Sequence, residues 1–464
     1  MENFYLRDLI KAVDGSFILG NPHLPVKNIG IDSRTIRQGQ VFFAIKGKKL
    51  DGHDFIKEAV ESKVSAIVYS KKDVDFKVFY TDLPSLVKVD DTSLALEKLA
   101  ACYRRKFNVK AVAVTGSNGK TTTKEMLASI FAIRGKTLSN KGNFNNRIGV
   151  PLTVFNLTGD TEYAVFELGT SEPGEIKVLS DITKPHCGII TNIGESHMEF
   201  FKTPQNVLRE KAGLIDGIDD DGFVVINNDN PYLKSYIPSI SKKIITFGLY
   251  SGADVYAKNI RLWLDKPMFD MYIDSKYETI ELPIKGKFNI FNALAAGAAA
   301  YGMGFSLAEI KKGLKHFNPP QMRMQSYVLK NGATIINDAY NANPSSMKEA
   351  INSLAQSYPN KNIILVLGDM LELGENAVKY HSEIGRFINS LPYVKSIYLT
   401  GSLVSNIKNE LTDKKSKYFM TKIIICEELM KELDENSVVF IKASRAMKLD
   451  AVYDEIIAMD RLKK

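Results

Sequence analysis

A glycine-rich segment followed by lysine and hydroxyl residues is the strongest chemical signal in the chain. Residues 112–123 read Val-Ala-Val-Thr-Gly-Ser-Asn-Gly-Lys-Thr-Thr-Thr, an apolar run that leads into a glycine-rich turn. Glycines let backbone amides approach phosphate oxygens, a helix N-terminus adds positive charge, and lysine and hydroxyl side chains reach terminal phosphates and Mg²⁺. The segment predicts a phosphate-binding loop of the short form GxxGKTT, formed by Gly116, Ser117, Asn118, Gly119, Lys120, Thr121 and Thr122. The alternative is a glycine-rich turn with a chance lysine.

Carboxylate and imidazole side chains follow two further apolar runs. Glu167 ends one such run, and His197 and Glu199 stand in the segment after the run that ends near Ile193. Ligands bind at the carboxyl ends of strands in open α/β sheets, so Glu167 and His197 could lie beside a bound triphosphate and hold a metal. Each residue alone is more often structural, and Glu199 could equally be a solvated side chain.

The elements that must position these residues alternate between short β-branched runs and helical patterns, which predicts an α/β protein with parallel sheets. In the first part we expect strands at 41–45, 65–69, 77–80 and 86–89, with helices from about 54 and over 93–106. In the middle part we expect strands at 110–115, 164–168, 188–193 and 223–227, a strand-rich stretch to about 283, and helices at 289–301 and 307–316. The last part predicts strands at 334–337, 363–367, 396–400 and 438–443, with helices after Pro344 and around Tyr380.

Three domains follow from this pattern and from the length of 464 residues. The boundaries are expected near residue 105, where a helix gives way to an apolar strand, and near Asn318-Pro319-Pro320, where prolines interrupt helical structure. We therefore expect a small N-terminal α/β domain (1–105), a central domain (106–318) and a Rossmann-like C-terminal domain (319–464).

Composition excludes several classes of protein. The net charge of +8 suggests nucleic acid, but the basic residues are spread along the chain, and anionic small molecules suit the excess equally well. Three scattered cysteines encode neither a disulfide framework nor a zinc site, which fits a reducing cytoplasm. Acidic residues interrupt the first 30 positions, so no signal peptide is expected. The longest weakly polar run, 293–305, is too short to span a membrane and predicts a close-packed core helix.

The segment 115–122 together with Glu167, His197 and Arg323 resembles the ATP-dependent Mur ligases, which build the peptide of bacterial cell-wall precursors. Further stretches resemble the branch that joins D-alanyl-D-alanine to UDP-N-acetylmuramoyl-tripeptide: 142–151 (GNFNNRIGVP), 172–176 (EPGEI), 337–347 (NDAYNANPSSM) and 367–374 (LGDMLELG). The resemblance runs in order from Asp32 to Arg445, nearly the whole chain. It implies a central ATPase-like domain with a parallel sheet, between a UDP-substrate domain and a domain for the incoming dipeptide.

The resemblance also implies the roles of the central residues. Lys120 and the surrounding amides would hold the ATP phosphates, Thr121 and Glu167 would bind one Mg²⁺, and His197 would help to bind a second. Lys211, in the segment 210–214 (EKAGL), matches a lysine that CO₂ carbamylates in the family, giving a carboxylate-like group that faces Mg²⁺. From sequence alone, Lys211 would otherwise be an ordinary lysine on a helix.

Other residues carry implied contacts with the nucleotide and substrates. Asn289 and Asn292 match the family's GxHNxxNxxAA stretch, which recognises the nucleotide, although Phe288 stands where histidine is usual. Arg323 resembles an arginine that the C-terminal domain brings to the phosphates, and Asp338 a carboxylate near the ribose; both require domain closure. The implied substrate-binding residues are Ser33 and Arg34 for UDP, Asn145 and Asn146 for the muramoyl peptide, and Tyr340, Asn341 and Asn343 on the third-domain side of the cleft.

The resemblance implies that an acyl phosphate, formed from the peptide carboxylate and ATP, is attacked by the dipeptide amine. Lys120, Lys211, His197 and Arg323 are the expected catalytic residues of this cytoplasmic enzyme, which we expect to be a monomer without a nucleic-acid partner. The alternatives are a sibling ligase for one amino acid and a folylpolyglutamate synthetase, both disfavoured by residues 340–344 (YNANP). A nucleotide-dependent switch or transport ATPase would leave the segment 32–35 (DSRT) unexplained.

Overall fold

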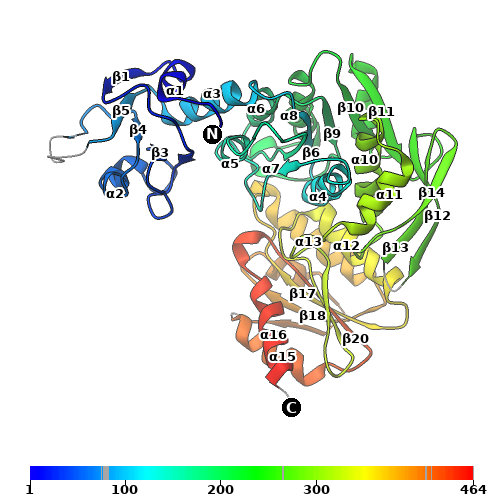
Figure 1. Cartoon of the computed structure of the whole chain (residues 1–464). Coiled ribbons are helices and arrows are strands. Elements are labelled where there is room, and N and C mark those ends of the chain that lie inside the picture. Colours follow the sequence, from blue (N-terminus) through cyan, green and yellow to red (C-terminus); the bar gives the residue numbers. More distant parts are fainter. Residues whose placement is uncertain (75, 77–82, 264–265, 413–414, 420, 463–464) are drawn as a thin grey trace.

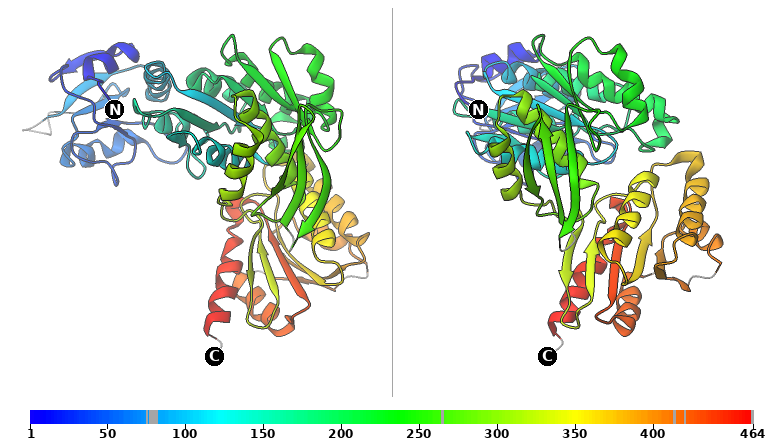
Figure 2. Two further views of the ribbon diagram at one scale, coloured as in Figure 1. Left: turned by 45° about the vertical axis from the view of Figure 1, so that its right-hand side comes forward. Right: turned by 90° about the vertical axis from the view of Figure 1, so that its right-hand side faces the viewer.

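The computed structural model describes residues 1–464 except 75, 77–82, 264–265, 413–414, 420 and 463–464. Its described residues form three β-sheets, each accompanied by helices and following one another along the chain (Figure 1). The N-terminal and C-terminal parts each adjoin the central part, as the further views in Figure 2 also show. The α/β prediction is therefore confirmed.

The N-terminal part contains a five-stranded sheet in the order β1-β5-β4-β3-β2, with β1 antiparallel and the other neighbours parallel. Its strands are β1 (Ser16–Leu19), β2 (Ile29–Gly30), β3 (Val41–Phe43), β4 (Ala66–Tyr69) and β5 (Ser85–Lys88). Its helices are α1 (Leu6–Ala12), η1 (Gly52–Phe55), α2 (Ile56–Glu61) and α3 (Thr92–Arg104). The strand expected at 77–80 lies outside the described residues.

The central part contains a nine-stranded sheet in the order β14-β13-β12-β11-β10-β9-β6-β8-β7. Its strands are β6 (Lys110–Thr115), β7 (Thr137–Ser139), β8 (Tyr163–Glu167), β9 (Cys187–Ile190), β10 (Phe223–Asn227), β11 (Lys243–Gly248), β12 (Val255–Trp263), β13 (Lys266–Ile273) and β14 (Lys276–Glu281). Its helices are α4 (Lys120–Phe131), α5 (Gly149–Val154), α6 (Glu175–Thr183), α7 (Met198–Phe201), α8 (Pro204–Asp216), α9 (Pro231–Tyr236), η3 (Ile237–Ser239), α10 (Asn289–Gly302) and α11 (Leu307–His316).

The central sheet is mixed, which corrects the expectation of a parallel sheet. Strands β6 to β12 pair in parallel, whereas β13 and β14 extend the edge as an antiparallel meander. Only two residues separate each of these strands from the next in the sequence, and so short a connection can join only antiparallel neighbours. The phosphate-loop segment follows a strand of the parallel half. The antiparallel strands lie at the other edge of the sheet.

The C-terminal part contains a six-stranded sheet in the order β15-β16-β20-β17-β18-β19, with only β15 antiparallel to its neighbour. Its strands are β15 (Gln325–Val328), β16 (Thr334–Asn337), β17 (Asn362–Gly368), β18 (Val394–Thr400), β19 (Lys415–Tyr418) and β20 (Ser437–Lys442). Its helices are α12 (Pro344–Ser357), η4 (Gly374–Asn376), α13 (Ala377–Asn389), α14 (Ser405–Asn409), α15 (Lys422–Glu432), η5 (Arg445–Met447) and α16 (Asp450–Leu462).

The central sheet is buried on both faces, which explains its continuous apolar strands. In β6, Ala111 and Ala113 face one hydrophobic core, and Val112 and Val114 face another. Helix α10 is buried along most of its length between α4, α11 and the sheet, as expected for a helix that is apolar all round. This packing fixes the carboxyl end of β6, where α4 begins. None of the helices in the described part of the chain is long and apolar enough to cross a membrane.

Candidate active site

The loop between β6 and α4 has the geometry expected of a phosphate-binding loop. Gly116 and Gly119 adopt φ angles of 146° and 81°, in the region that favours glycine. A Cβ atom at Gly116 would lie 1.9 Å from Oγ1 of Thr191, and one at Gly119 would lie 2.2 Å from Oδ1 of Asn292. Both positions therefore require glycine, and the loop leads directly into a helix that begins at Lys120.

The ammonium group of Lys120 is held inside the loop itself. Its Nζ donates hydrogen bonds to the carbonyl oxygens of Gly116 at 2.8 Å and Ser117 at 3.3 Å. Burial lowers the pKa of Lys120, an effect that nearby Glu167 opposes and nearby Arg323 reinforces. A cation that is poorly compensated by carboxylates is suited to binding an anion such as a phosphate.

Glu167, at the end of β8, has a buried carboxylate with one oxygen in use and one free. Nδ2 of Asn145 donates to Oε1 at 2.9 Å, whereas the buried Oε2 has no hydrogen-bond partner among the described residues. Asn140 fixes the backbone of Glu167 through both its amide nitrogen and its amide oxygen. An unpartnered buried carboxylate oxygen fits a hard cation such as Mg²⁺.

His197 contacts a residue from the C-terminal part that the sequence did not single out. Its Nδ1 lies 2.7 Å from Oε2 of Glu372, at ion-pair distance but without the alignment of a hydrogen bond. The contact with His197 lowers the pKa of the Glu372 carboxyl. The backbone amide of Glu199 also donates to the carbonyl of Glu372 at 3.1 Å. Among the described residues, no group of three or more His, Cys, Asp or Glu side chains is placed to hold a metal.

Lys211 is buried in α8, contrary to what an ordinary helical lysine would show. Burial lowers its pKa well below the usual lysine value, and the charge of Lys120 lowers it further. Neighbouring Glu210 is engaged elsewhere, since it accepts hydrogen bonds from Thr170 and from the amides of Gly174 and Ile176 at the start of α6. Within the described residues, Lys211 forms no ion pair with a carboxylate. A buried amine whose pKa is lowered in this way fits carbamylation by CO₂.

Asn289 and Asn292 form a hydrogen-bonded pair at the start of α10. Nδ2 of Asn292 donates to Oδ1 of Asn289 at 2.8 Å, and Oδ1 of Asn292 accepts from Thr123 in α4 at 3.4 Å. The pair therefore lies against the phosphate loop. Phe288, which precedes them, packs against the hydrophobic core of the C-terminal part, so this position makes an apolar contact between domains.

Arg323 and Asp338 reach the same region from the C-terminal part. The guanidinium of Arg323 lies over the ring of Tyr340, 4.1 Å from its centroid, and donates to Oγ1 of Thr121 at 3.4 Å. Its buried Nε has no hydrogen-bond partner in the described part of the chain. Asp338 pairs with buried Lys442 at 2.5 Å and accepts from the amide of Met324 at 3.2 Å.

These groups surround one cavity of about 1020 Å³. It is lined by most of the predicted site residues: Ser117, Asn118, Gly119, Lys120, Thr122, Asn145, Asn146, Glu167, His197, Asn289, Asn292, Arg323, Asp338, Tyr340, Asn341 and Asn343. Gly116, Thr121 and Lys211 are not in its lining, although all three lie close to residues that are. Residues more than 200 positions apart in the sequence therefore share one site.

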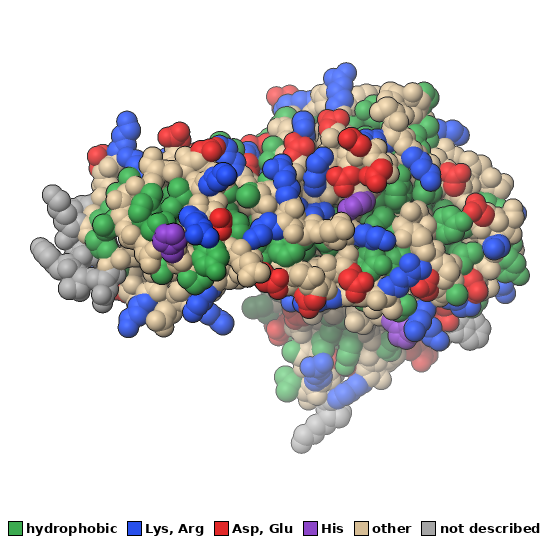
Figure 3. Space-filling model, turned by 45° about the horizontal axis from the view of Figure 1, so that its top comes forward, with side chains coloured by type: hydrophobic (Ala, Val, Ile, Leu, Met, Phe, Trp, Pro, Cys, Tyr) green, Lys and Arg blue, Asp and Glu red, His purple; other side chains and the backbone are tan. Residues whose placement is uncertain are grey.

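The structure does not bring Ser33 and Arg34 to this cavity. Arg34 is exposed and forms a bidentate pair with Asp32, which lowers the pKa of Asp32 to about 2. The N-terminal part instead contributes Lys48, whose Nζ lies 3.2 Å from the carboxylate of Glu172. On the molecular face that Figure 3 shows, basic and acidic side chains are interspersed.

Several residues of the site were missed by sequence reasoning. Glu372 lies within the segment 367–374 and Lys442 near the end of the stretch that carries the family resemblance, but neither residue was expected to contact the site. Ser345, which contacts the phosphate loop, carries no chemical signal of its own. The contacts of Glu372 and Ser345 arise where the C-terminal part packs on the central part, whereas Lys442 contacts Asp338 within the C-terminal part.

Comparison with known proteins agrees with this geometry. Three family models match successive parts of the chain: the Mur ligase family catalytic domain at 25–104, the Mur ligase middle domain at 114–300, and the Mur ligase glutamate ligase domain at 322–445. The UDP-N-acetylmuramoyl-tripeptide–D-alanyl-D-alanine ligase of Bacillus subtilis is 33% identical, over 97% of this chain and 98% of its own length.

Solved structures show the same similarity. MurF from Acinetobacter baumannii matches with a TM-score of 0.90 and 31% identity, covering 98% of this chain and 99% of that one. MurF ligase from Thermotoga maritima, solved in complex with ADP, matches with a TM-score of 0.84 and 27% identity, covering 95% and 99% of the two chains. The chain therefore belongs to the Mur ligase family and, along nearly its whole length, resembles the members that act on UDP-N-acetylmuramoyl-tripeptide and D-alanyl-D-alanine.

Proposed function

We propose that this chain is an ATP-dependent ligase that joins D-alanyl-D-alanine to UDP-N-acetylmuramoyl-tripeptide. The products are UDP-N-acetylmuramoyl-pentapeptide, ADP and phosphate, and the process is peptidoglycan precursor synthesis, on which cell shape and division depend. The observation that carries the proposal is the convergence of Lys120, Glu167 and Arg323 on one cavity. The full-length similarity to the Bacillus subtilis ligase supports the choice of substrates.

ATP is proposed to bind across the phosphate loop. The amides from Gly116 to Thr122 and the ammonium of Lys120 would contact the phosphates, while Asn289 and Asn292 would recognise the nucleotide next to α10. Arg323 would reach the phosphates from the C-terminal part, and its unpartnered Nε supports this role. Asp338 is proposed to lie near the ribose, in competition with its present partners Lys442 and Met324.

Mg²⁺ is proposed to be held by Thr121 and Glu167, with His197 and a carbamate on Lys211 at a second position. The free Oε2 of Glu167 and the buried amine of Lys211 support this assignment. Bound Mg²⁺ would neutralise phosphate charge as it develops. Asn140 holds the backbone of Glu167 and Asn145 holds its carboxylate, so the position of this ligand does not depend on a bound ion.

The reaction needs an activated acyl group, because an amine cannot expel oxide from a carboxylate. The terminal carboxylate of the tripeptide would attack the γ-phosphorus of ATP, and ADP would leave, with Lys120 and Arg323 stabilising the transferred phosphoryl group. The dipeptide amine would then attack the acyl carbon, release phosphate and lose its proton as the amide forms. Closure of the cavity would protect the acyl phosphate from water.

The substrates are proposed to enter from two sides. Asn145 and Asn146 would line the muramoyl-peptide path, and Tyr340, Asn341 and Asn343 the side of the incoming dipeptide. Ser33 and Arg34 are proposed for UDP, which would leave the nucleotide end of the donor outside the cavity. We also propose that the three domains span 1–105, 106–318 and 319–464, which the three family matches support.

The setting of the enzyme is part of the proposal. The three cysteines are all free, which supports a cytoplasmic location. We also propose that the chain acts as a monomer.

The test is phosphate release from ATP in the presence of UDP-N-acetylmuramoyl-tripeptide, with either D-alanyl-D-alanine or single amino acids as acceptors. We expect phosphate release that depends on the dipeptide. Mass spectrometry should show a UDP product that is heavier than the donor by one D-alanyl-D-alanine unit. Release with a single amino acid alone would move the assignment to a sibling ligase. Hydrolysis without any acceptor would indicate a switch or transport ATPase.

A further inference from the structure

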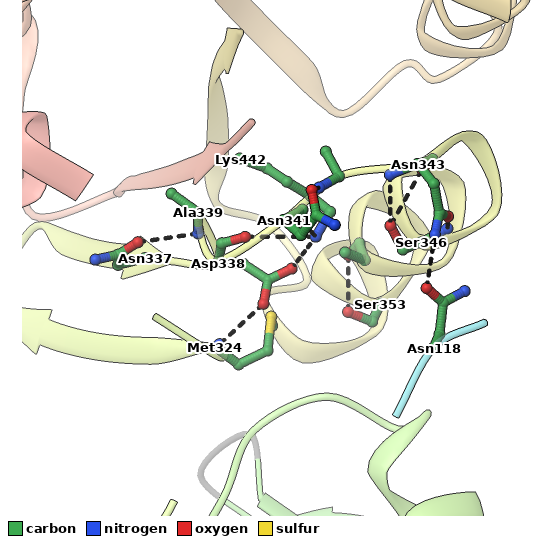
Figure 4. A network of polar contacts seen from close by, with 12 residues as sticks. Asn118, Met324, Asn337, Asp338, Ala339, Asn341, Asn343, Ser346, Ser353 and Lys442 are labelled. Atoms are coloured by element: carbon green, nitrogen blue, oxygen red, sulfur yellow. Dashed lines mark hydrogen bonds and ion pairs between the residues drawn. The ribbon is translucent and has the colours of Figure 1, made fainter. Parts of the chain in front are cut away.

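Three polar side chains form a closed ring of hydrogen bonds between the phosphate loop and the C-terminal part. Nδ2 of Asn343 donates to Oδ1 of Asn118 at 2.8 Å, and Nδ2 of Asn118 donates to Oγ of Ser345 at 3.1 Å. The hydroxyl of Ser345 in turn donates to Oδ1 of Asn343 at 3.0 Å. Each residue both donates and accepts, so the ring fixes the orientation of both amides and its bonds strengthen one another. Figure 4 shows Asn118 facing Asn343 across the two parts of the chain.

The central part is shaped to receive this contact. Gly194 lies so close to Ser345 that a Cβ atom there would be 3.0 Å from its Oγ. The backbone of Asn118 is fixed as well, because its amide donates to Oδ1 of Asn192 at 2.8 Å and its carbonyl accepts from Thr191 at 2.6 Å. The position of Asn118 is therefore set by the end of β9 on one side and by Ser345 and Asn343 on the other.

The other end of the ring is built into α12. Asn343 is the N-cap of this helix, and its Oδ1 accepts from the amide of Ser346 at 2.8 Å. Met347 and Ile351 of α12 are buried in the core of the C-terminal part. The polar atoms of the Asn343 side chain are thus turned toward α12 and the phosphate loop, and they are occupied there.

We propose that Asn118, Asn343 and Ser345 form a latch that holds the C-terminal domain against the phosphate loop. All three are positioning residues. They place the acceptor side of the cavity, including Tyr340 and Arg323, at a fixed distance from the nucleotide phosphates. The structural part of this inference stands alone, whereas its catalytic consequence rests on the proposed ligase function.

Two substitutions open the ring without removing a helix cap. Asn343→Ser keeps a good N-cap, because serine caps helices as well as asparagine, but it lacks the amide donor to Asn118. Ser345→Ala removes the hydroxyl at a helical position where alanine is favourable. Both variants should keep the melting temperature of the parent. Asn343→Ala, which removes the cap as well, is the matched control for a purely structural role and should lower that temperature.

The first readout does not depend on turnover. Small-angle X-ray scattering with saturating ADP should show a larger radius of gyration for Asn343→Ser and Ser345→Ala than for the parent. Hydrogen exchange of the amides in residues 116–119 should also become faster. Unchanged scattering and exchange in both variants would overturn the latch, whatever reaction the enzyme catalyses.

The second readout is a double-mutant cycle on ligation. Asn118→Ala and Asn343→Ser should each lower kcat/KM roughly two- to tenfold, as expected for the loss of one net hydrogen bond. Because they break the same ring, the double variant should be no slower than the slower single variant. Effects that multiply would show that the residues act independently and would contradict the proposal. If the parent enzyme does not ligate the dipeptide, the proposed function fails while the scattering result still decides the latch.

Discussion

The side chains around the cavity carry more positive than negative charge where the phosphates are proposed to bind. Burial lowers the pKa of Lys120, nearby Arg323 lowers it further, and nearby Glu167 opposes both effects. Such an arrangement is costly in the free protein, because a buried cation is stabilised only by a partner charge. An anionic substrate supplies that partner, so binding energy and chemistry arise from the same residues.

Replacement of Lys120 tests this arrangement at its centre. Lys120→Ala should lower kcat by more than about a hundredfold, since it removes a charge that stabilises the transferred phosphoryl group. Steady-state phosphate release gives the rate, and circular dichroism confirms that the fold is kept. A variant with a near-normal rate would show that the loop does not bind the reacting phosphates.

Lys211 should carry a carbamate when CO₂ is present. Its pKa lies below the ordinary value of 10.5, so the neutral amine that reacts with CO₂ is populated at lower pH than for an exposed lysine. Occupancy should therefore rise with pH and level off once the amine is fully deprotonated. Carbon NMR of enzyme equilibrated with labelled bicarbonate measures it, and Lys211→Met provides the blank. A parent spectrum identical to that blank at every pH would contradict this prediction.

The sequence predicted those site residues whose chemistry is local. Lys120 stands in a spaced glycine motif, and Glu167 and His197 follow apolar strands, so type and position together indicated a function. Glu372 and Ser345 could not be found in this way, because their contacts join segments more than 170 positions apart. Ser33 and Arg34 matched a motif, yet no contact in the described residues links them to the cavity.

At the scale of elements, α4 carries the phosphate loop and is held in place by α10 and α11. Arg134, just after α4, forms a bidentate ion pair with Glu309 of α11, with two N···O distances of 2.7 Å. Its guanidinium also lies over the ring of Phe305, 4.0 Å from the centroid. Glu309 completes the capping box of α11 with Ser306. One carboxylate therefore serves both the start of α11 and its attachment to α4.

Glu309→Gln should make the protein less stable at neutral pH, by about 0.5–1 kcal/mol for a partly exposed pair. The hydrogen bond from Arg134 lowers the pKa of Glu309 to about 2, below the ordinary value of 4.5. The stabilisation by this ion pair is therefore complete at pH values above the ordinary pKa of 4.5. It is lost as the pH falls toward the pKa of Glu309 in the folded protein. Urea unfolding from pH 7 down to acid should show the two proteins converging. A difference that is independent of pH would assign the effect to packing.

Most elements were predictable because their apolar periodicity is strong. The strands at 110–115, 223–227 and 334–337 have the predicted bounds, and α10 and α11 begin at the predicted residues. The prediction missed β1, β2, β7, β15 and β19, each of which has only two to four residues. Such strands exist because a neighbouring strand pairs with them, and pairing between distant segments leaves no local signal.

At the scale of the whole molecule, the N-terminal and central parts share one hydrophobic core. It includes Leu9 and Leu99 from the N-terminal part and Ala113 and Phe166 from the central sheet. The C-terminal part has two cores of its own. It meets the central part mainly through polar contacts such as those of Glu372 and Asn343, so we expect it to move as a unit against the other two.

Tyr103 tests this division, since it lies at the centre of the shared core. Its ring contacts Phe4, Phe107 and Phe155, and its hydroxyl donates to the carbonyl of Leu157 at 3.0 Å. Tyr103→Ala should lower the free energy of unfolding by about 3–5 kcal/mol, as the truncation of other large aromatic side chains in cores does. Calorimetry should show one unfolding transition for residues 1–318, at a lower temperature than in the parent. The transition of the C-terminal part should keep its temperature. A shift confined to the N-terminal part would contradict a shared core.

The central claim is that the peptide carboxylate takes the γ-phosphoryl group of ATP within the cavity. The most direct test labels both oxygens of the terminal tripeptide carboxylate with a heavy oxygen isotope and follows the label during ligation with D-alanyl-D-alanine. If the acyl phosphate forms, each molecule of released phosphate contains one labelled oxygen and the new amide keeps the other. Phosphate without the label, or label transferred to AMP, would contradict an acyl phosphate and with it the proposed role of the Lys120 loop.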